Sequence, residues 1–196
     1  MTFNKYLRAD ETDSKIRMPT NELDAHVSNV TVGELIGQLE HFSDRERSMY
    51  PWADRFVIGF PLPPWQRPFV WTQEQEIRFI QSIWQGVDVG SYMVNAYELS
   101  NSTEFRKFSD ILLDGQQRLT ALEHYLFDML PVPDVTGKDR VWSELPRIER
   151  RRFSNFHFAR ANIKSWKETM LRKAYDLRSF GGTAHTEDQR ASLSRP

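Results

Sequence analysis

The residues with the clearest capacity for chemistry are the five that run from Asp114 to Arg118 and read Asp-Gly-Gln-Gln-Arg. A glycine at a turn lets the backbone approach a ligand closely, because it has no Cβ. A carboxylate can hold a divalent cation or act as a base, glutamine can orient a water or contact a base edge, and arginine can grip phosphate oxygens with two N–H groups. This set suits a phosphate-binding site. An equally weighted alternative is a plain turn with Arg118 on a helix surface.

A second candidate lies at residues 64–71, which read PWQRPFVW. The prolines favour an extended and rigid path. Such a segment can present Gln66 and Arg67 to a pocket, or lay Trp65 or Trp71 against a nucleobase. The alternative is that the aromatic side chains pack in the core while Arg67 pairs with a carboxylate.

A third feature is a basic block in a chain whose net charge is only -1. Residues 138–178 carry 12 basic and 5 acidic side chains. A block of this kind can bind nucleic acid, with Arg150, Arg151 and Arg152 as the candidate phosphate contacts. A solvated helix surface is the other reading of the same charges.

The elements around these residues follow from local signals. A strand over 107–113 should lead through the Asp-Gly turn into a helix over 117–130. Capping residues Thr31 and Thr72 predict helices over 32–42 and 73–85, the second ending at Gly86. Further expected elements are strands at 56–60 and 91–99, a loop over 131–147 and two helices within 147–178.

Composition limits the class of protein. With 196 residues, 39% of them hydrophobic and 27% charged, the chain suits one folded domain and not a collagen-like or wholly disordered one. The absence of cysteine excludes disulfides, cysteine-based zinc sites and thiol nucleophiles. No apolar run could serve as a signal sequence or cross a bilayer, so we expect a cytoplasmic protein without a membrane partner.

We expect an α+β fold in which a small mixed sheet, built from 56–60, 91–99 and 107–113, is packed by helices and joined by a helical C-terminal part. The predicted organisation is a flexible arm over 1–30, a core over 31–137 and a basic helical part of the same domain over 138–196.

Two of these stretches carry a family resemblance. QRPFVW followed by ILLDGQQRLTAL resembles the N-terminal domain of GmrSD-type modification-dependent restriction systems, within the wider ParB/sulfiredoxin-like group. A later stretch, FGGTAHTEDQR, is similar to the family's glycine-containing segment that leads into an acid-x-x-arginine turn. It departs from the family pattern in having His185 where leucine is usual and no asparagine before the glycines.

The resemblance implies a ParB/sulfiredoxin-like fold and a pocket that binds a nucleoside triphosphate with Mg²⁺, and it implies triphosphate hydrolysis. In that reading Asp114 serves the metal or the attacking water, and Arg118 contacts phosphate. The remaining implied positions are Gln117 or Gln116 orienting the water or the base, Gly115 in the turn, Gln66 and Arg67 in the opposing wall, and Gly182 and Arg190 in a third wall.

Three functions remain open at this point. The first is a nucleoside triphosphatase or phosphotransferase, for which Arg118→Ala should abolish turnover and spare the fold. The second is a DNA-binding or DNA-cleaving protein that uses the basic block. The third is a non-catalytic module that binds a nucleotide or a partner protein. In larger relatives this domain controls an attached nuclease, so a nuclease or other effector on another chain is an expected partner.

Overall fold

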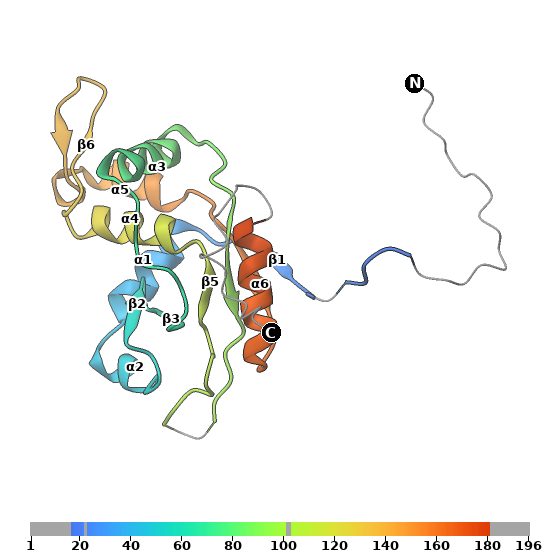
Figure 1. Cartoon of the computed structure of the whole chain (residues 1–196). Coiled ribbons are helices and arrows are strands. Elements are labelled where there is room, and N and C mark those ends of the chain that lie inside the picture. Colours follow the sequence, from blue (N-terminus) through green and yellow to red (C-terminus); the bar gives the residue numbers. More distant parts are fainter. Residues whose placement is uncertain (1–16, 22, 101–102, 181–196) are drawn as a thin grey trace, which may run out of the picture.

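The computed structural model describes residues 17–21, 23–100 and 103–180, and it confirms an α+β fold with a small mixed sheet. The sheet has the strand order β1-β8-β4-β5 (Figure 1). These strands are β1 (His26–Ser28), β8 (Ala159–Ile163), β4 (Ser91–Asn95) and β5 (Leu112–Asp114). β4 is parallel to β8 and antiparallel to β5, so it lies in the interior of the sheet.

Helices pack on both faces of this sheet. The described helices are α1 (Val32–His41), α2 (Asp44–Ser48), α3 (Gln73–Gln85), α4 (Gln116–Leu126), α5 (Arg147–Ser154) and α6 (Glu168–Phe180), with a 3-10 turn at Trp142–Glu144. Capping boxes at Thr31 and Thr72 begin α1 and α3, and the left-handed Gly86 ends α3 as expected. Local sequence therefore determines both ends of α3.

Alternation along β4 divides the interior into two cores. Tyr92 and Val94 point into the larger core, which α1, α3 and α4 share with Phe153 and Phe158. The residue between them, Met93, belongs to a smaller core under α6. Figure 1 shows α6 alone on one side of the strands, opposite the group formed by α1, α3, α4 and α5.

Three strand predictions need correction. Residues 56–60 lie outside the main sheet, because Ile58 and Gly59 adopt left-handed conformations that turn β2 (Arg55–Val57) back onto β3 (Phe60–Leu62) as a separate hairpin. The strand predicted over 107–113 shortens to β5, since positive φ angles at Phe108 and Asp110 interrupt extended backbone. The strand predicted over 91–99 ends at Asn95.

The C-terminal half contains more strand than predicted. Both helices expected within 147–178 are present as α5 and α6, but β8 lies between them. The stretch predicted as a loop over 131–147 contains the hairpin of β6 (Val132–Pro133) and β7 (Asp139–Arg140). Within the predicted N-terminal arm, β1 pairs with β8. None of the helices that the structure describes is long and apolar enough to cross a bilayer.

Candidate functional site

The turn from β5 to α4 requires glycine at position 115. Gly115 has φ +100, and a Cβ added there would lie 2.6 Å from Cβ of Tyr92. No side chain fits that distance, and L residues rarely adopt that backbone conformation. The glycine therefore brings the start of α4 directly against β4, while the predicted close approach of this backbone to a ligand stays a prediction.

The N-terminus of α4 has no side-chain cap. The first-turn N–H groups of any α-helix lack partners within the helix. In α1 and α3 a threonine side chain accepts one of them, whereas α4 begins at Gly115, which has no side chain to offer. Gln116 and Gln117 in this first turn are buried. Among the described residues nothing accepts from the first-turn N–H groups, so the start of α4 presents these donors and the positive end of the helix dipole at the site.

Arg118 is more deeply placed than a surface helix residue. Its guanidinium donates to the carbonyl oxygens of Val89 (2.8 Å) and Ser91 (3.0 Å) and to Asp114 Oδ2 (3.2 Å). Burial lowers the pKa of Arg118, and the adjacent Asp114 carboxylate opposes that shift. The premise that Arg118 is a helix-surface residue is therefore wrong, and we expect Arg118→Ala to cost stability, because it removes the guanidinium donor of the Val89 carbonyl and one of the two donors of the Ser91 carbonyl.

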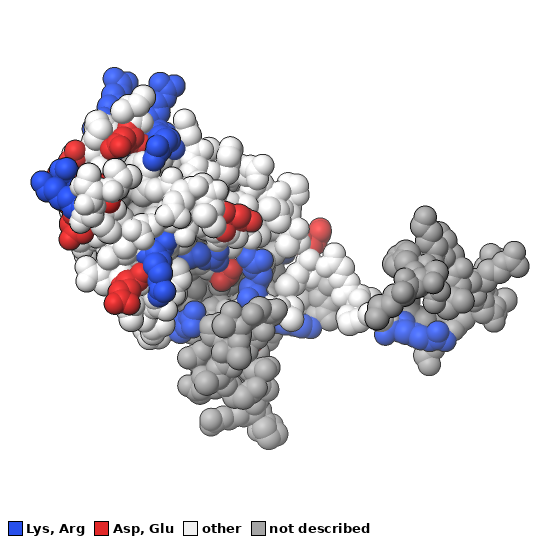
Figure 2. All heavy atoms as spheres, turned by 90° about the horizontal axis from the view of Figure 1, so that it is seen from above, with Lys and Arg blue, Asp and Glu red and all other residues white. Residues whose placement is uncertain are grey.

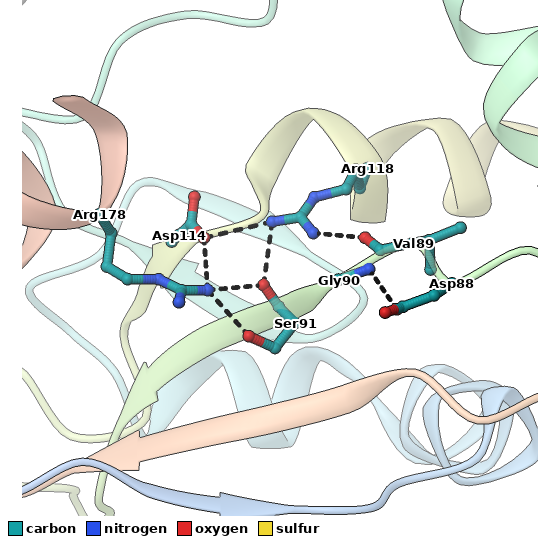
Figure 3. A network of polar contacts seen from close by, with 7 residues as sticks. All are labelled: Asp88, Val89, Gly90, Ser91, Asp114, Arg118 and Arg178. Atoms are coloured by element: carbon teal, nitrogen blue, oxygen red, sulfur yellow. Dashed lines mark hydrogen bonds and ion pairs between the residues drawn. The ribbon is translucent and has the colours of Figure 1, made fainter. Parts of the chain in front are cut away.

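A second arginine reaches the same carboxylate from α6. Arg178 Nη2 donates to Asp114 Oδ2 (3.1 Å), to Ser91 O (2.9 Å) and to Ser91 Oγ (2.9 Å). Figure 3 shows the two guanidinium groups approaching Asp114 and Ser91 from opposite sides. One carboxylate oxygen and one carbonyl oxygen therefore hold two positive charges together.

The segment predicted to face this turn is fastened at both ends. Arg55 donates to the carbonyl oxygens of Pro63 (3.3 Å) and Gln66 (2.9 Å). At the other end the Gln117 amide accepts from the backbone N–H groups of Val70 and Trp71. The Gln117 Nε2 also donates to the Pro68 carbonyl oxygen. In this structure Gln117 binds backbone, and its predicted part in orienting water stays a prediction.

These groups surround a cavity of about 110 Å³. Its lining joins the predicted turn and the predicted wall: Gln66, Arg67, Trp71, Asp114, Gly115, Gln116, Gln117, Arg118, Tyr175 and Ser179. Gln66 and Gln116 are 5% and 6% exposed, and the Oε1 atom of each has no hydrogen-bond partner among the described residues. Buried amide oxygens are normally hydrogen-bonded, so these two are available to accept from a water or from a donor group of a ligand.

A cavity of about 590 Å³ lies elsewhere, between α3, α5 and the β6–β7 hairpin. Both arginines in its lining are already engaged, since Arg140 pairs with Asp134 and Arg152 lies over the Trp84 ring. The smaller cavity, with its converging arginines and unsatisfied amides, is the better candidate for chemistry.

Other predicted site residues lie apart from this cavity. Arg150, Arg151 and Arg152 are exposed on α5, and none of the described α5 residues lines the cavity. Trp65 packs against Tyr175 and carries Arg172 over its ring, which confirms its core reading. Gly182 and Arg190 lie outside the described residues, as does the rest of the FGGTAHTEDQR stretch beyond Phe180.

Sequence reasoning missed the contribution of α6, namely Tyr175, Arg178 and Ser179. A signal was present, because Leu171, Ala174 and Tyr175 form the buried face of this helix and Arg178 follows Ala174 by four residues on the same side. An arginine that continues an apolar helix face predicts a buried polar partner. Burial raises the pKa of the Tyr175 hydroxyl, while Arg67 and Ser179 oppose the shift.

Across the part of the chain that the structure describes, no three histidine or acidic side chains gather as a metal-binding cluster. Asp114 is the one acidic side chain in the described lining of the cavity. Its Oδ1 atom accepts no hydrogen bond from the described residues. Asp114 therefore suits a cation that brings most of its ligands with it, as Mg²⁺ bound to a nucleotide does.

Sequence comparison shows which proteins this chain is similar to. Residues 42–191 match the family described as the N-terminal domain of the GmrSD restriction endonuclease. The chain is also similar to an uncharacterized protein of Methanocaldococcus jannaschii, with 30% identity over 115 residues that cover 50% of this chain and 20% of that protein. This chain thus spans about a fifth of that relative's length. No solved structure matches, so the ParB/sulfiredoxin-like assignment stays a prediction.

Proposed function

The chain belongs to the family of the N-terminal domain of GmrSD restriction endonucleases, and from this membership we propose that it binds a nucleoside triphosphate at the β5–α4 turn. We further propose that it hydrolyses the triphosphate or transfers its phosphate. The family gives this activity a DNA-related, restriction-type setting.

The observation that carries the proposal is the uncapped start of α4 over a polar cavity. Backbone N–H groups that converge at a helix N-terminus bind phosphate oxygens in many proteins. Here they stand beside the Arg118 guanidinium and Arg67, which also lines the cavity. An anionic group would accept from first-turn N–H groups for which the described part of the chain provides no acceptor.

The volume of the cavity restricts which part of a nucleotide it takes. Pockets that enclose whole drug-sized ligands measure about 300 to 1,000 Å³, whereas this cavity measures about 110 Å³. It therefore suits phosphate groups, with the nucleoside at the mouth. Trp71 lines the cavity and is half-buried, so its ring is placed to contact a base there.

The chemistry assigned to the protein is positioning and charge stabilisation. Phosphoryl transfer requires little covalent participation from the enzyme, and most of the rate enhancement comes from neutralising charge on the phosphate oxygens. Arg118 and the helix N-terminus would supply that neutralisation. Asp114 Oδ1 would hold the nucleotide-borne Mg²⁺ or accept a proton from water, and the Gln116 amide oxygen would accept a hydrogen bond from that water.

The test is nucleotide binding and phosphate release by the full chain. ATP, GTP, CTP and UTP would be titrated with Mg²⁺ by calorimetry, and phosphate release would be followed for the nucleotides that bind. We expect Asp114→Asn to lower release by at least a hundredfold, because it removes the carboxylate but keeps the shape of the side chain. Arg151→Ala is the matched control, since that side chain is exposed on α5.

The outcomes separate the alternatives. Phosphate release that survives Asp114→Asn would contradict the assignment of hydrolysis to this site. Binding without release in the wild type would replace the enzyme with a nucleotide-binding module. Absence of binding by all four nucleotides would overturn the proposal as a whole.

DNA binding is the second candidate function, and the exposure of Arg150 and Arg151 on α5 favours it. Figure 2 shows Lys and Arg side chains interspersed with Asp and Glu on one face of the molecule, so the expected affinity is modest. If phosphate contacts dominate, binding of duplex DNA should fall steeply with salt and disappear on charge reversal of both arginines. Salt-independent or absent binding in fluorescence anisotropy at low salt would exclude this function.

A further inference from the structure

Arg178 differs from the residues that the family resemblance assigned to the site. It comes from α6, 64 residues beyond Asp114 in the chain, and it packs α6 against the start of β4 and the end of β5. Three hydrogen bonds leave one of its nitrogens, Nη2. Within the described residues, its Nε and Nη1 donate to no other group.

The charges at this point do not balance. Within residues 17–21, 23–100 and 103–180, Asp114 is the one acidic side chain that pairs with Arg118 and Arg178, and both guanidinium groups hold the same oxygen, Oδ2. Each also donates to the Ser91 carbonyl oxygen. Two cations close to one anion leave an excess positive charge. Repulsion between the two arginines offsets part of the attraction that each has for Asp114. The repulsion would be relieved by a second anion.

The two arginines are unequal in their freedom to serve such an anion. Arg118 is 20% exposed and has a third bond, to the Val89 carbonyl oxygen, that holds it on the inner side. Arg178 is 34% exposed and ends a helix whose neighbouring residues Tyr175 and Ser179 line the cavity. A guanidinium in that position can turn from Asp114 to the cavity while α6 stays in place.

We propose that Arg178 is a second phosphate-binding arginine of this site, which exchanges Asp114 for the outer phosphates of a bound nucleoside triphosphate. The inference rests on the proposed function, because it specifies how that function is carried out. The exchange leaves Asp114 Oδ2 open to the cation that accompanies the nucleotide. It also makes α6 a wall of the occupied site. Because Arg178 would contact the outer phosphates, affinity should depend on how many phosphates the nucleotide carries.

The experiment compares Arg178→Gln, Arg178→Lys and the control Lys173→Gln, which is exposed on the same helix. Each full-length variant is titrated with the best-bound nucleoside triphosphate and with the monophosphate of the same nucleoside, and its melting temperature is recorded. A charged hydrogen bond to phosphate is expected to raise affinity by a factor of roughly ten or more. We therefore expect Arg178→Gln to weaken triphosphate binding at least tenfold and monophosphate binding less than about twofold. Arg178→Lys should fall between Arg178→Gln and the wild type, because lysine keeps the charge without the fork.

Three results would overturn the inference. Unchanged triphosphate affinity in Arg178→Gln would show that Arg178 does not reach phosphate, while the proposed function would stand on wild-type binding. An equal loss for triphosphate and monophosphate, with a lower melting temperature, would make Arg178 a structural tie between α6 and the sheet. Failure of the wild type to bind any triphosphate would remove the proposed function and this inference with it.

Discussion

Helices α4 and α5 are both short and both carry ionisable side chains, but they use these side chains in opposite ways. On α4, Arg118 and Glu123 are turned inward, where Glu123 accepts from the Ile58 backbone N–H at 2.9 Å and Arg118 binds two carbonyl oxygens. On α5, Arg150 and Arg151 are exposed to solvent. The same residue type is thus part of the interior in one helix and part of the surface in the other.

The difference shows that local charge density does not identify the site. Within the basic block over 138–178, Arg178 pairs with Asp114 beside Arg118, whereas Arg150 and Arg151 of the same block are exposed on α5. Electrostatic interactions are stronger where water is excluded. A few arginines of restricted exposure therefore define a more specific site than many exposed ones.

The largest expected effect is at the beginning of α4. Gly115→Ala should destabilise the protein by about 3–5 kcal/mol, because the new Cβ overlaps Tyr92 and the backbone is left-handed. Urea unfolding followed by circular dichroism measures the loss. Gly37→Ala is the control: a Cβ there meets nothing within 4 Å, and alanine in helix α1 should stabilise by about 0.5–1 kcal/mol. Equal stability of Gly115→Ala and the wild type would show that the β5–α4 turn is not as close as described.

Removal of the inner arginine should have the next largest effect. Arg118→Ala should cost about 2–4 kcal/mol in free energy of unfolding, since it leaves the Val89 and Ser91 carbonyls and Asp114 with fewer donors. The same urea titration measures it. A loss below about 0.5 kcal/mol, the range of surface substitutions, would place Arg118 with the arginines of α5 and end the contrast between the two helices.

The half-buried carboxyl of Glu123 on α4 should make stability depend on pH. Burial raises the pKa of Glu123 above its ordinary value of 4.5, so the folded state binds this proton more tightly than the unfolded state does. Stability from this group is therefore greatest at low pH and declines as pH rises through the pKa of the unfolded and then the folded chain. Glu123→Gln keeps an acceptor for the Ile58 N–H and removes the titration. Its stability relative to the wild type should increase from pH 4 to pH 7 in urea unfolding, and a constant difference would contradict the assignment.

The smallest effect is expected on α5. Arg151→Ala should change the free energy of unfolding by less than about 0.5 kcal/mol, since the side chain is exposed. Thermal unfolding and nucleotide titration of the same sample would measure both properties. A change in nucleotide affinity on this substitution would connect α5 to the site and remove the distinction drawn between the two helices.

Features decided by neighbouring residues were predictable from the sequence. The ends of α3 follow from Thr72 and Gly86, and the order of β5, turn and α4 follows from the Asp-Gly turn between an apolar run and an amphipathic one. The pairing of the QRPFVW segment with this turn came from the family resemblance, and the structure places residues of both at one cavity. Its physical cause, the Gln117 amide bound to the backbone of Val70 and Trp71, could not be read from spacing.

Features decided by distant residues were missed. The sequence of β8, Ala-Arg-Ala-Asn-Ile, alternates apolar and polar residues over only five positions, and alanine and asparagine have low strand propensity. Its strand conformation depends on pairing with β1 on one side and β4 on the other. The partners of Arg178 likewise become available only when α6 packs on β5. In β8 long-range pairing overrides weak local strand propensity, and at Arg178 the packing of α6 on the sheet decides which groups it contacts.

The position of β8 between β1 and β4 determines when the site can form during folding. In β8, Asn162 lies opposite His26 of β1 and Arg160 lies opposite Tyr92 of β4. The sheet therefore forms only after most of the described chain is available. Contacts of such high sequence separation slow folding, because loop entropy is lost before they form. During synthesis the Asp114–Arg118 pair, four residues apart, can form as soon as α4 is made, whereas Arg178 arrives only with α6. The nascent protein would therefore have the inner half of its anion site well before the outer half, and an affinity for triphosphate that needs both arginines would appear only at the end of folding.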